Sequence, residues 1–72
     1  MKPTELLREA RKAAGLTQPE GAKRCGVSYS AFEKWERGAQ EMSAPVLVGC
    51  LVLLGAPVAE ALAAGRQVAE AQ

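Results

Sequence analysis

The stretch YSAFEKWERG, residues 29–38, combines two aromatic side chains with several polar ones. Phe32 and Trp35 are three positions apart, so on a helix they share one face. The hydrogen-bonding and charged side chains are left to the other faces; they are Tyr29, Ser30, Glu33, Lys34 and Arg37. Two rings of this size should be buried, which predicts a helix held by its aromatic face and suited to recognition by its polar face.

The composition argues against catalysis. The chain has no His, Asp or Asn, and all eight acidic residues are Glu. General acid–base chemistry would have to use Glu, Lys, Tyr or Cys, and a four-ligand zinc site would need more than Cys25 and Cys50. We therefore expect no enzyme, no cofactor, no metal site and no small-molecule ligand.

The net charge of +1 conceals an asymmetry along the chain. Residues 1–38 carry eight Lys or Arg against five Glu, hence +3, and residues 39–72 carry one Arg against three Glu, hence −2. A basic first half suits a nucleic-acid-binding surface. No signal-peptide pattern precedes the two cysteines, and prolines and glycines interrupt the longest apolar run. We expect a cytoplasmic protein with reduced cysteines and no membrane span.

Glycines mark the ends of the expected helices, because a left-handed residue commonly closes a helix. They are Gly15, Gly26, Gly38 and Gly55. The 72 residues fit one small all-α domain, with helices predicted at about 3–14, 18–25, 29–37, 44–54 and 57–71. Thr17 and Glu20 form a capping box before the second helix, and Ser28 and Ser43 can cap the third and fourth.

The fourth helix is apolar on every side. We expect its inward stripe to be Leu47, Cys50, Leu51 and Leu54. The remaining large apolar side chains would be exposed unless the last helix or a second subunit covers them; they are Val46, Val48, Val52 and Leu53.

Residues 7–38, LREARKAAGLTQPEGAKRCGVSYSAFEKWERG, resemble the Cro/repressor-type (XRE-family) helix-turn-helix domain. The matching motifs are LR.AR in the first helix, GLTQ.E.A opening the second, GVS in the turn and WERG closing the third. The resemblance is strong over 4–38 and moderate over 39–55. It implies a lambda-repressor-like fold with a DNA-binding core at 4–55. The C-terminal helix at 56–72, which completes the expected five-helix domain, lies outside the resemblance and is expected to serve dimerisation.

The resemblance also implies site residues on double-stranded DNA, with the third helix in the major groove. Base-reading positions would be Tyr29, Ser30, Glu33 and Lys34, and phosphate-binding positions Gln18, Ser28, Lys23 and Arg37. Lys34 could donate to guanine, Glu33 could accept from cytosine N4, and Tyr29 could lie on a thymine methyl. Alternatively, Glu33 is a solvated carboxylate that repels phosphate and tunes Lys34.

Gln18 would brace the third helix, and Glu36 would pair with Arg11 on the first helix. Two positions depart from the family pattern. Gly21 stands where Leu or Val is usual, and Cys25 replaces a larger aliphatic residue. Phe32 is larger than the usual Ile or Val, and we expect it to fill the missing volume.

One recognition helix reads only a few base pairs, so we expect a homodimer on a palindromic operator. Its interface would use Val48, Val52, Val58 and Leu62. Alternatively, the last helix folds back over the fourth within one subunit. The predicted function is transcriptional regulation, most simply repression by a phage-like regulator. The alternatives are an antitoxin-like or accessory protein-interaction module that uses the apolar C-terminal half, and nonspecific DNA coating.

Overall fold

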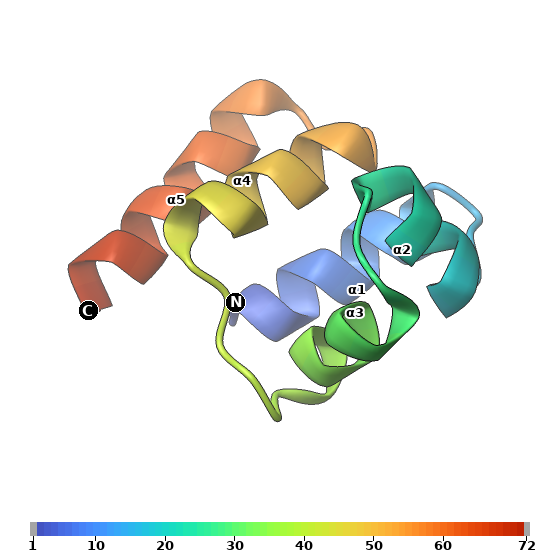
Figure 1. The fold of residues 1–72 in the computed structure, drawn as a ribbon. Helices are drawn as coiled ribbons and strands as arrows, with labels where there is room; N and C mark the ends of the chain where they lie inside the picture. The colour runs from blue at the N-terminus through green and yellow to red at the C-terminus, as the bar shows by residue number, and fades with distance from the viewer. Residues whose placement is uncertain (1, 72) are drawn as a thin grey trace.

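The computed structural model describes residues 2–71, and these residues form five α-helices and no strand (Figure 1). The helices are α1 (Pro3–Ala13), α2 (Gln18–Cys25), α3 (Tyr29–Arg37), α4 (Ala44–Leu53) and α5 (Val58–Ala71). Each bound lies within one residue of its predicted position, and the predicted all-α class is confirmed. No helix within residues 2–71 has the length and apolarity that a membrane crossing requires.

The ends of α3 follow the sequence signals. Gly26 and Gly38 bracket it with φ angles of 72° and 79°, a backbone region that strains any side chain with a Cβ atom. The Ser28 hydroxyl accepts a hydrogen bond from the Ala31 amide at 3.1 Å. These local contacts fix where the helix begins and ends.

Of the other two predicted N-caps, the one at α2 forms and the one at α4 does not. At α2 the Glu20 amide donates to the Thr17 hydroxyl at 3.3 Å, and the Thr17 amide donates to Glu20 Oε1 at 2.9 Å. The capping box is therefore confirmed. Ser43 occupies the N-cap position of α4, but its side chain accepts no cap hydrogen bond, so the prediction that it caps this helix is wrong.

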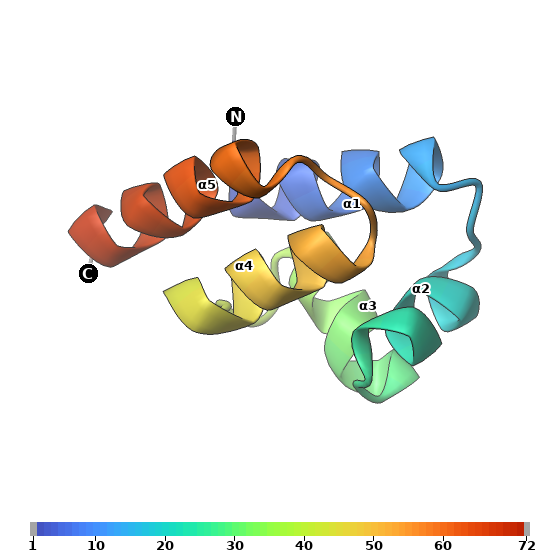
Figure 2. The same ribbon diagram turned by 90° about the horizontal axis from the view of Figure 1, so that it is seen from above.

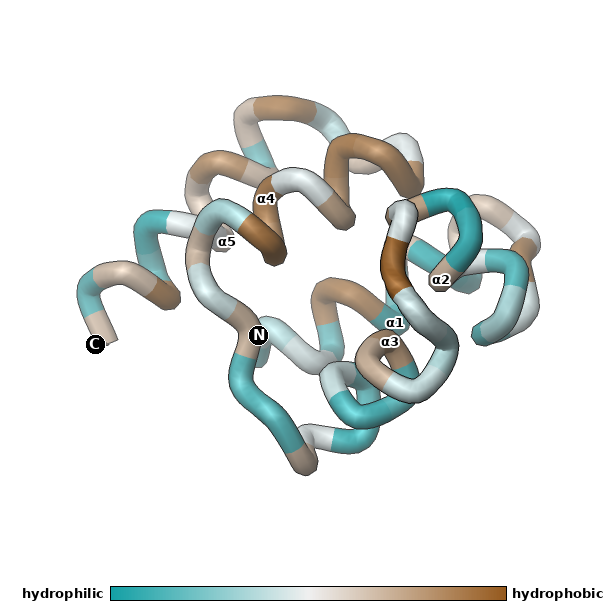
Figure 3. Tube along the Cα trace, in the orientation of Figure 1, coloured by the Kyte–Doolittle hydropathy of each residue, from teal (hydrophilic) through white to brown (hydrophobic). Residues whose placement is uncertain are grey.

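The helices form two groups joined by α1. In Figures 1 and 2, α2 and α3 lie together at one end, whereas α4 and α5 pack side by side at the other. Contacts from α1 reach α3, α4 and α5. Figure 3 shows that hydrophobic residues concentrate along α4 and the neighbouring part of α5, while much of α2 and α3 is hydrophilic.

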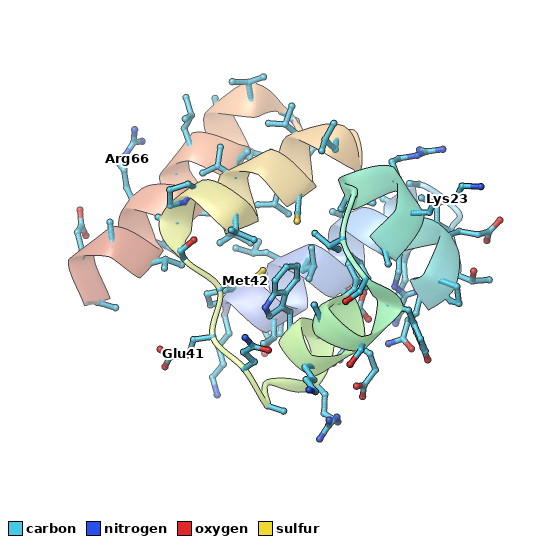
Figure 4. The ribbon with its side chains drawn as sticks, in the orientation of Figure 1. Lys23, Glu41, Met42 and Arg66 are labelled. Atoms are coloured by element: carbon cyan, nitrogen blue, oxygen red, sulfur yellow. The ribbon has the colours of Figure 1, made fainter. Side chains whose placement is uncertain are left out.

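The core lies where these helices meet. The predicted inward stripe of α4 is confirmed; Leu47, Cys50, Leu51 and Leu54 are all buried. Met42, in the loop between α3 and α4, is also buried and points into the domain (Figure 4), although no periodic pattern had marked it. The loop is thereby attached to the core by one apolar side chain.

The packing of α5 changes how accessible one residue of the predicted dimer interface is. Gly65 of α5 is buried against Val48 of α4 so closely that a Cβ atom there would collide with Val48 Cγ2. Because α5 folds back over α4 within one chain, Val48 is partly buried and packed against the core. It is therefore less accessible to a second subunit than the other three residues of the predicted dimer interface. Val52, Val58 and Leu62 remain exposed at 39%, 59% and 46%.

Candidate nucleic-acid interface

The aromatic face of α3 is sunk in the domain. Phe32 is fully buried and Trp35 is 9% exposed, and both belong to the central apolar cluster. Burying rings of this size contributes a large part of the apolar area that a domain of this length can remove from water. The helix therefore cannot rotate about its axis without exposing them.

The opposite face of α3 is open to solvent. Tyr29 is 51% exposed, Ser30, Lys34 and Arg37 are also exposed, and Glu33 is partly exposed. These five side chains occupy one continuous arc by helical spacing. The structure thus brings the four predicted base-reading residues together on one surface. Arg37, a predicted phosphate ligand, lies on the same surface.

A buried carboxylate on α3 connects this helix to α1 and α2. Glu36 is 2% exposed. Its oxygens accept from Arg11 Nε at 2.7 Å and Nη2 at 3.1 Å, and from Gln18 Nε2 at 3.0 Å. Arg8 donates to the Glu36 carbonyl at 2.9 Å. The predicted Arg11–Glu36 pair is present, and Gln18 braces α3 by joining it.

This network leaves few buried polar groups without partners. Arg11 also donates through Nη1 to the Leu16 carbonyl at 2.9 Å, so its guanidinium bridges α3 and the turn before α2. Within residues 2–71, no buried side-chain nitrogen or oxygen lacks a hydrogen-bond partner. A charged cluster whose polar atoms are all paired can hold the angle between α2 and α3, because a change of angle would leave a buried charge unpaired.

Two more of the predicted phosphate ligands lie on or beside the turn of the motif. Ser28 is exposed, and its hydroxyl keeps acceptor and donor capacity beyond the cap bond to Ala31. Lys23 points outward from α2 (Figure 4). Arg66, on α5, points outward on the other side of the molecule and belongs to neither helix of the motif.

Glu33 and Arg37 form an ion pair that sequence reasoning missed. Arg37 Nε donates to Glu33 Oε1 at 2.6 Å, and Arg37 Nη2 lies 3.4 Å from Glu33 Oε2. The hydrogen bond from Arg37 holds the pKa of Glu33 below its usual value, and the same bond raises the pKa of Arg37. The spacing of four residues on a helix was the available signal.

Phe32 fills the space left by Gly21. A Cβ atom on Gly21 would lie 3.0 Å from Phe32 Cζ and 3.1 Å from Arg11 Cδ. These approaches are closer than ordinary van der Waals contact. The predicted compensation, a large ring for a missing aliphatic side chain, is confirmed.

The two cysteines are free and lie in contact between α2 and α4. Cys25 Sγ donates to the Cys50 carbonyl oxygen at 3.8 Å. A hydrogen bond with the Cys50 side chain, together with burial, raises the pKa of the Cys25 thiol. They act as small packing residues at this junction. Residues 2–71 contain no cluster of three or more His, Cys, Asp or Glu side chains that could hold a metal ion.

Comparison with known proteins identifies the family. Searches of curated proteins and of solved structures gave no match. The family described as a helix-turn-helix domain matches residues 4–64, which covers most of the chain and reaches into α5, beyond the limit of the resemblance. The buried anchor, the braced α2 and α3, and this match together identify the chain as a member of the family of XRE-like helix-turn-helix domains.

Proposed function

We propose that this protein is a sequence-specific, double-stranded DNA-binding transcriptional regulator that acts as a repressor by occluding a promoter. Membership of the helix-turn-helix family supports a DNA-binding regulator. The observation that carries the finer proposal is the outward face of α3, which displays hydrogen-bonding side chains while its aromatic face is locked in the core. A face held in this way suits insertion into a major groove.

The proposed contacts follow the chemistry of base edges and phosphates. Lys34 donates to guanine N7 and O6, Tyr29 lies against a thymine methyl, and Glu33 accepts from cytosine N4. Ser30 contacts a base edge. The phosphate-binding set is Gln18, Ser28, Lys23 and Arg37, with Gln18 and Ser28 at helix starts, where backbone amides favour anions.

A twofold dimer on a palindromic operator belongs to the same proposal. Val52, Val58 and Leu62 are exposed apolar side chains on neighbouring helices, which supports a self-complementary contact. Two copies of α3 about 34 Å apart would read half-sites one turn of duplex apart.

A second candidate function rests on the solvent face of α4, which carries no charge. Its exposed residues are Pro45, Val46, Gly49, Val52 and Leu53. Such a surface also suits a partner protein, as in an accessory or antitoxin-like module.

The deciding experiment is selection from random duplexes, read by sequencing, with the wild type and two variants. Wild type should enrich a palindrome, and the double variant Tyr29→Ala, Lys34→Ala should lose enrichment because both removed groups face the duplex. Arg66→Ala is the matched control for the lost cation, since it removes the same charge from α5. No enrichment by wild type at low or moderate salt would overturn sequence-specific recognition and favour the partner-protein module.

A further inference from the structure

We infer that Glu33 is a specificity-determining residue that acts by competing with DNA phosphate for the Arg37 guanidinium. In the free protein it occupies the edge of Arg37 that would bind a phosphate. The Glu33 carboxylate can leave Arg37 at little cost in free energy only where the duplex offers it another hydrogen-bond donor. The inference rests on the proposed DNA-binding function and adds a mechanism that discriminates against noncognate duplexes.

The geometry of the pair carries the first step. Arg37 presents Nε and Nη2 to the two Glu33 oxygens, at 2.6 and 3.4 Å. This is the two-pronged edge through which arginine binds carboxylates and phosphates alike. A phosphate and Glu33 therefore compete for the same donors.

The surroundings of the pair carry the second step. Among residues 2–71 the only other ion pair is the buried Arg11–Glu36 contact, so Lys34 has no carboxylate within ion-pair distance. The proposed reading face thus presents one free cation, Lys34, and one compensated cation, Arg37. Glu33 precedes both of them along α3, and the charge of Lys34 also lowers the pKa of Glu33.

The energetics of the pair allow exchange. An exposed pair of this spacing is weak, so it opens readily when a better partner is present. A released carboxylate can accept from cytosine N4 or adenine N6, whereas the acceptors that guanine and thymine present in the major groove would repel it. The protein would then discriminate between duplexes in two ways. Noncognate duplexes would lose the Arg37–phosphate contact or face repulsion from Glu33, and the cognate duplex would gain a hydrogen bond to Glu33.

The test compares Glu33→Gln with a matched charge control, Glu60→Gln, which removes an exposed carboxylate from α5. Affinity is measured for a duplex of scrambled sequence and for the enriched duplex, over a series of salt concentrations. One added phosphate contact steepens the slope of log affinity against log salt by about 0.9, equivalent to up to about eightfold tighter binding at 0.1 M salt. Glu33→Gln should tighten binding to the scrambled duplex severalfold and steepen its slope, and Glu60→Gln should do neither.

A second background shows whether Arg37 is the group involved. In an Arg37→Ala protein, Glu33→Gln should change affinity for the scrambled duplex by less than about twofold. The substitution still removes a negative charge near the phosphates, but there is no Arg37 guanidinium for it to release. An equal effect with and without Arg37 would overturn the inference. So would weaker binding of Glu33→Gln to the enriched duplex with unchanged binding to the scrambled one, which would make Glu33 a base reader alone.

The outcomes separate this inference from the proposed function. If wild type binds duplexes and Glu33→Gln behaves like Glu60→Gln, the competition is absent and the proposed function stands. If neither wild type nor any variant binds a duplex at low salt, the proposed function fails and this inference fails with it. Circular dichroism melts of all variants verify that the exposed substitutions leave the fold intact.

Discussion

Single side chains hold the recognition helix in place through one buried carboxylate. Glu36 accepts three hydrogen bonds from Arg11 and Gln18, and its position explains why the first two helices of the domain must carry these residue types. Lysine could not replace Arg11 fully, because its point charge cannot engage both carboxylate oxygens and the Leu16 carbonyl. The network is a set of interdependent contacts.

Arg11→Ala should therefore be strongly destabilising. It leaves the Glu36 carboxylate buried without its cation, which costs about 3–5 kcal/mol in free energy of unfolding. Urea denaturation gives this value directly, and Arg11→Lys should fall between the alanine variant and wild type. Arg24→Ala is the control, since that exposed arginine makes no ion pair within residues 2–71 and should change stability by about 0.5 kcal/mol or less. Equal losses for Arg11→Ala and Arg24→Ala would refute the role of the network.

At the scale of elements, α2 and α3 pack together because a small residue on α2, Gly21, leaves room for a large ring on α3, Phe32. Gly21 weakens α2 by about 1 kcal/mol of helix propensity relative to alanine, yet it lets Phe32 occupy the space beside Arg11. The chain thus combines a poor helix former with a large ring, and the two positions should be energetically coupled.

Gly21→Ala should have different effects on stability in two backgrounds. In wild type the new Cβ atom would crowd Phe32, and overpacking of this kind costs about 1–3 kcal/mol, which exceeds the propensity gain. In a Phe32→Leu background only the flexible Arg11 side chain remains close to the new Cβ atom, so the same change should be less destabilising by at least about 1 kcal/mol. A double-mutant cycle by chemical denaturation measures the coupling.

Gly49→Ala provides the control for helix propensity alone. A Cβ atom at Gly49 would meet nothing within 4 Å, and the residue lies in the exposed part of α4. This variant should gain about 0.5–1 kcal/mol in any background. If Gly21→Ala changed stability equally with Phe32 and with Leu at position 32, the proposed compensation between Gly21 and Phe32 would be wrong.

At the scale of the whole molecule, polarity divides between the two groups of helices. The α2–α3 end is hydrophilic, and α4 with α5 presents exposed valines and leucines (Figure 3). The proposed dimer would remove part of this apolar area from water, using the side of α4 and α5 that carries Val52, Val58 and Leu62.

Leu62→Lys should convert the proposed dimer to a monomer, because it places a charge in an apolar contact. Sedimentation velocity at matched concentrations measures the change, and affinity for the enriched palindrome should fall at least about tenfold as one half-site contact is lost. Leu53→Lys is the matched control, since Leu53 is an exposed leucine like Leu62 but lies about 100° from Val52 around α4. A wild-type monomer at every soluble concentration, or equal effects of both variants, would contradict this interface.

The sequence by itself determined the local structure. Helix ends depend on residues within one turn of each other, so Gly26, Gly38 and the Thr17–Glu20 box could be recognised directly. The burial of Phe32 and Trp35 followed from their helical spacing and size. The resemblance supplied the Arg11–Glu36 pair, since no local pattern joins two residues so far apart in the chain.

Only the tertiary structure decided which surfaces are covered. Val48 and Val52 look alike in the sequence, but Gly65 gives α5 a close approach to α4 that covers Val48 and leaves Val52 exposed. Met42 is buried because its loop passes over the core. Burial of this kind is set by contacts between segments that are distant in the sequence. Helical periodicity shows which face of a helix is apolar, but not which segment will cover that face.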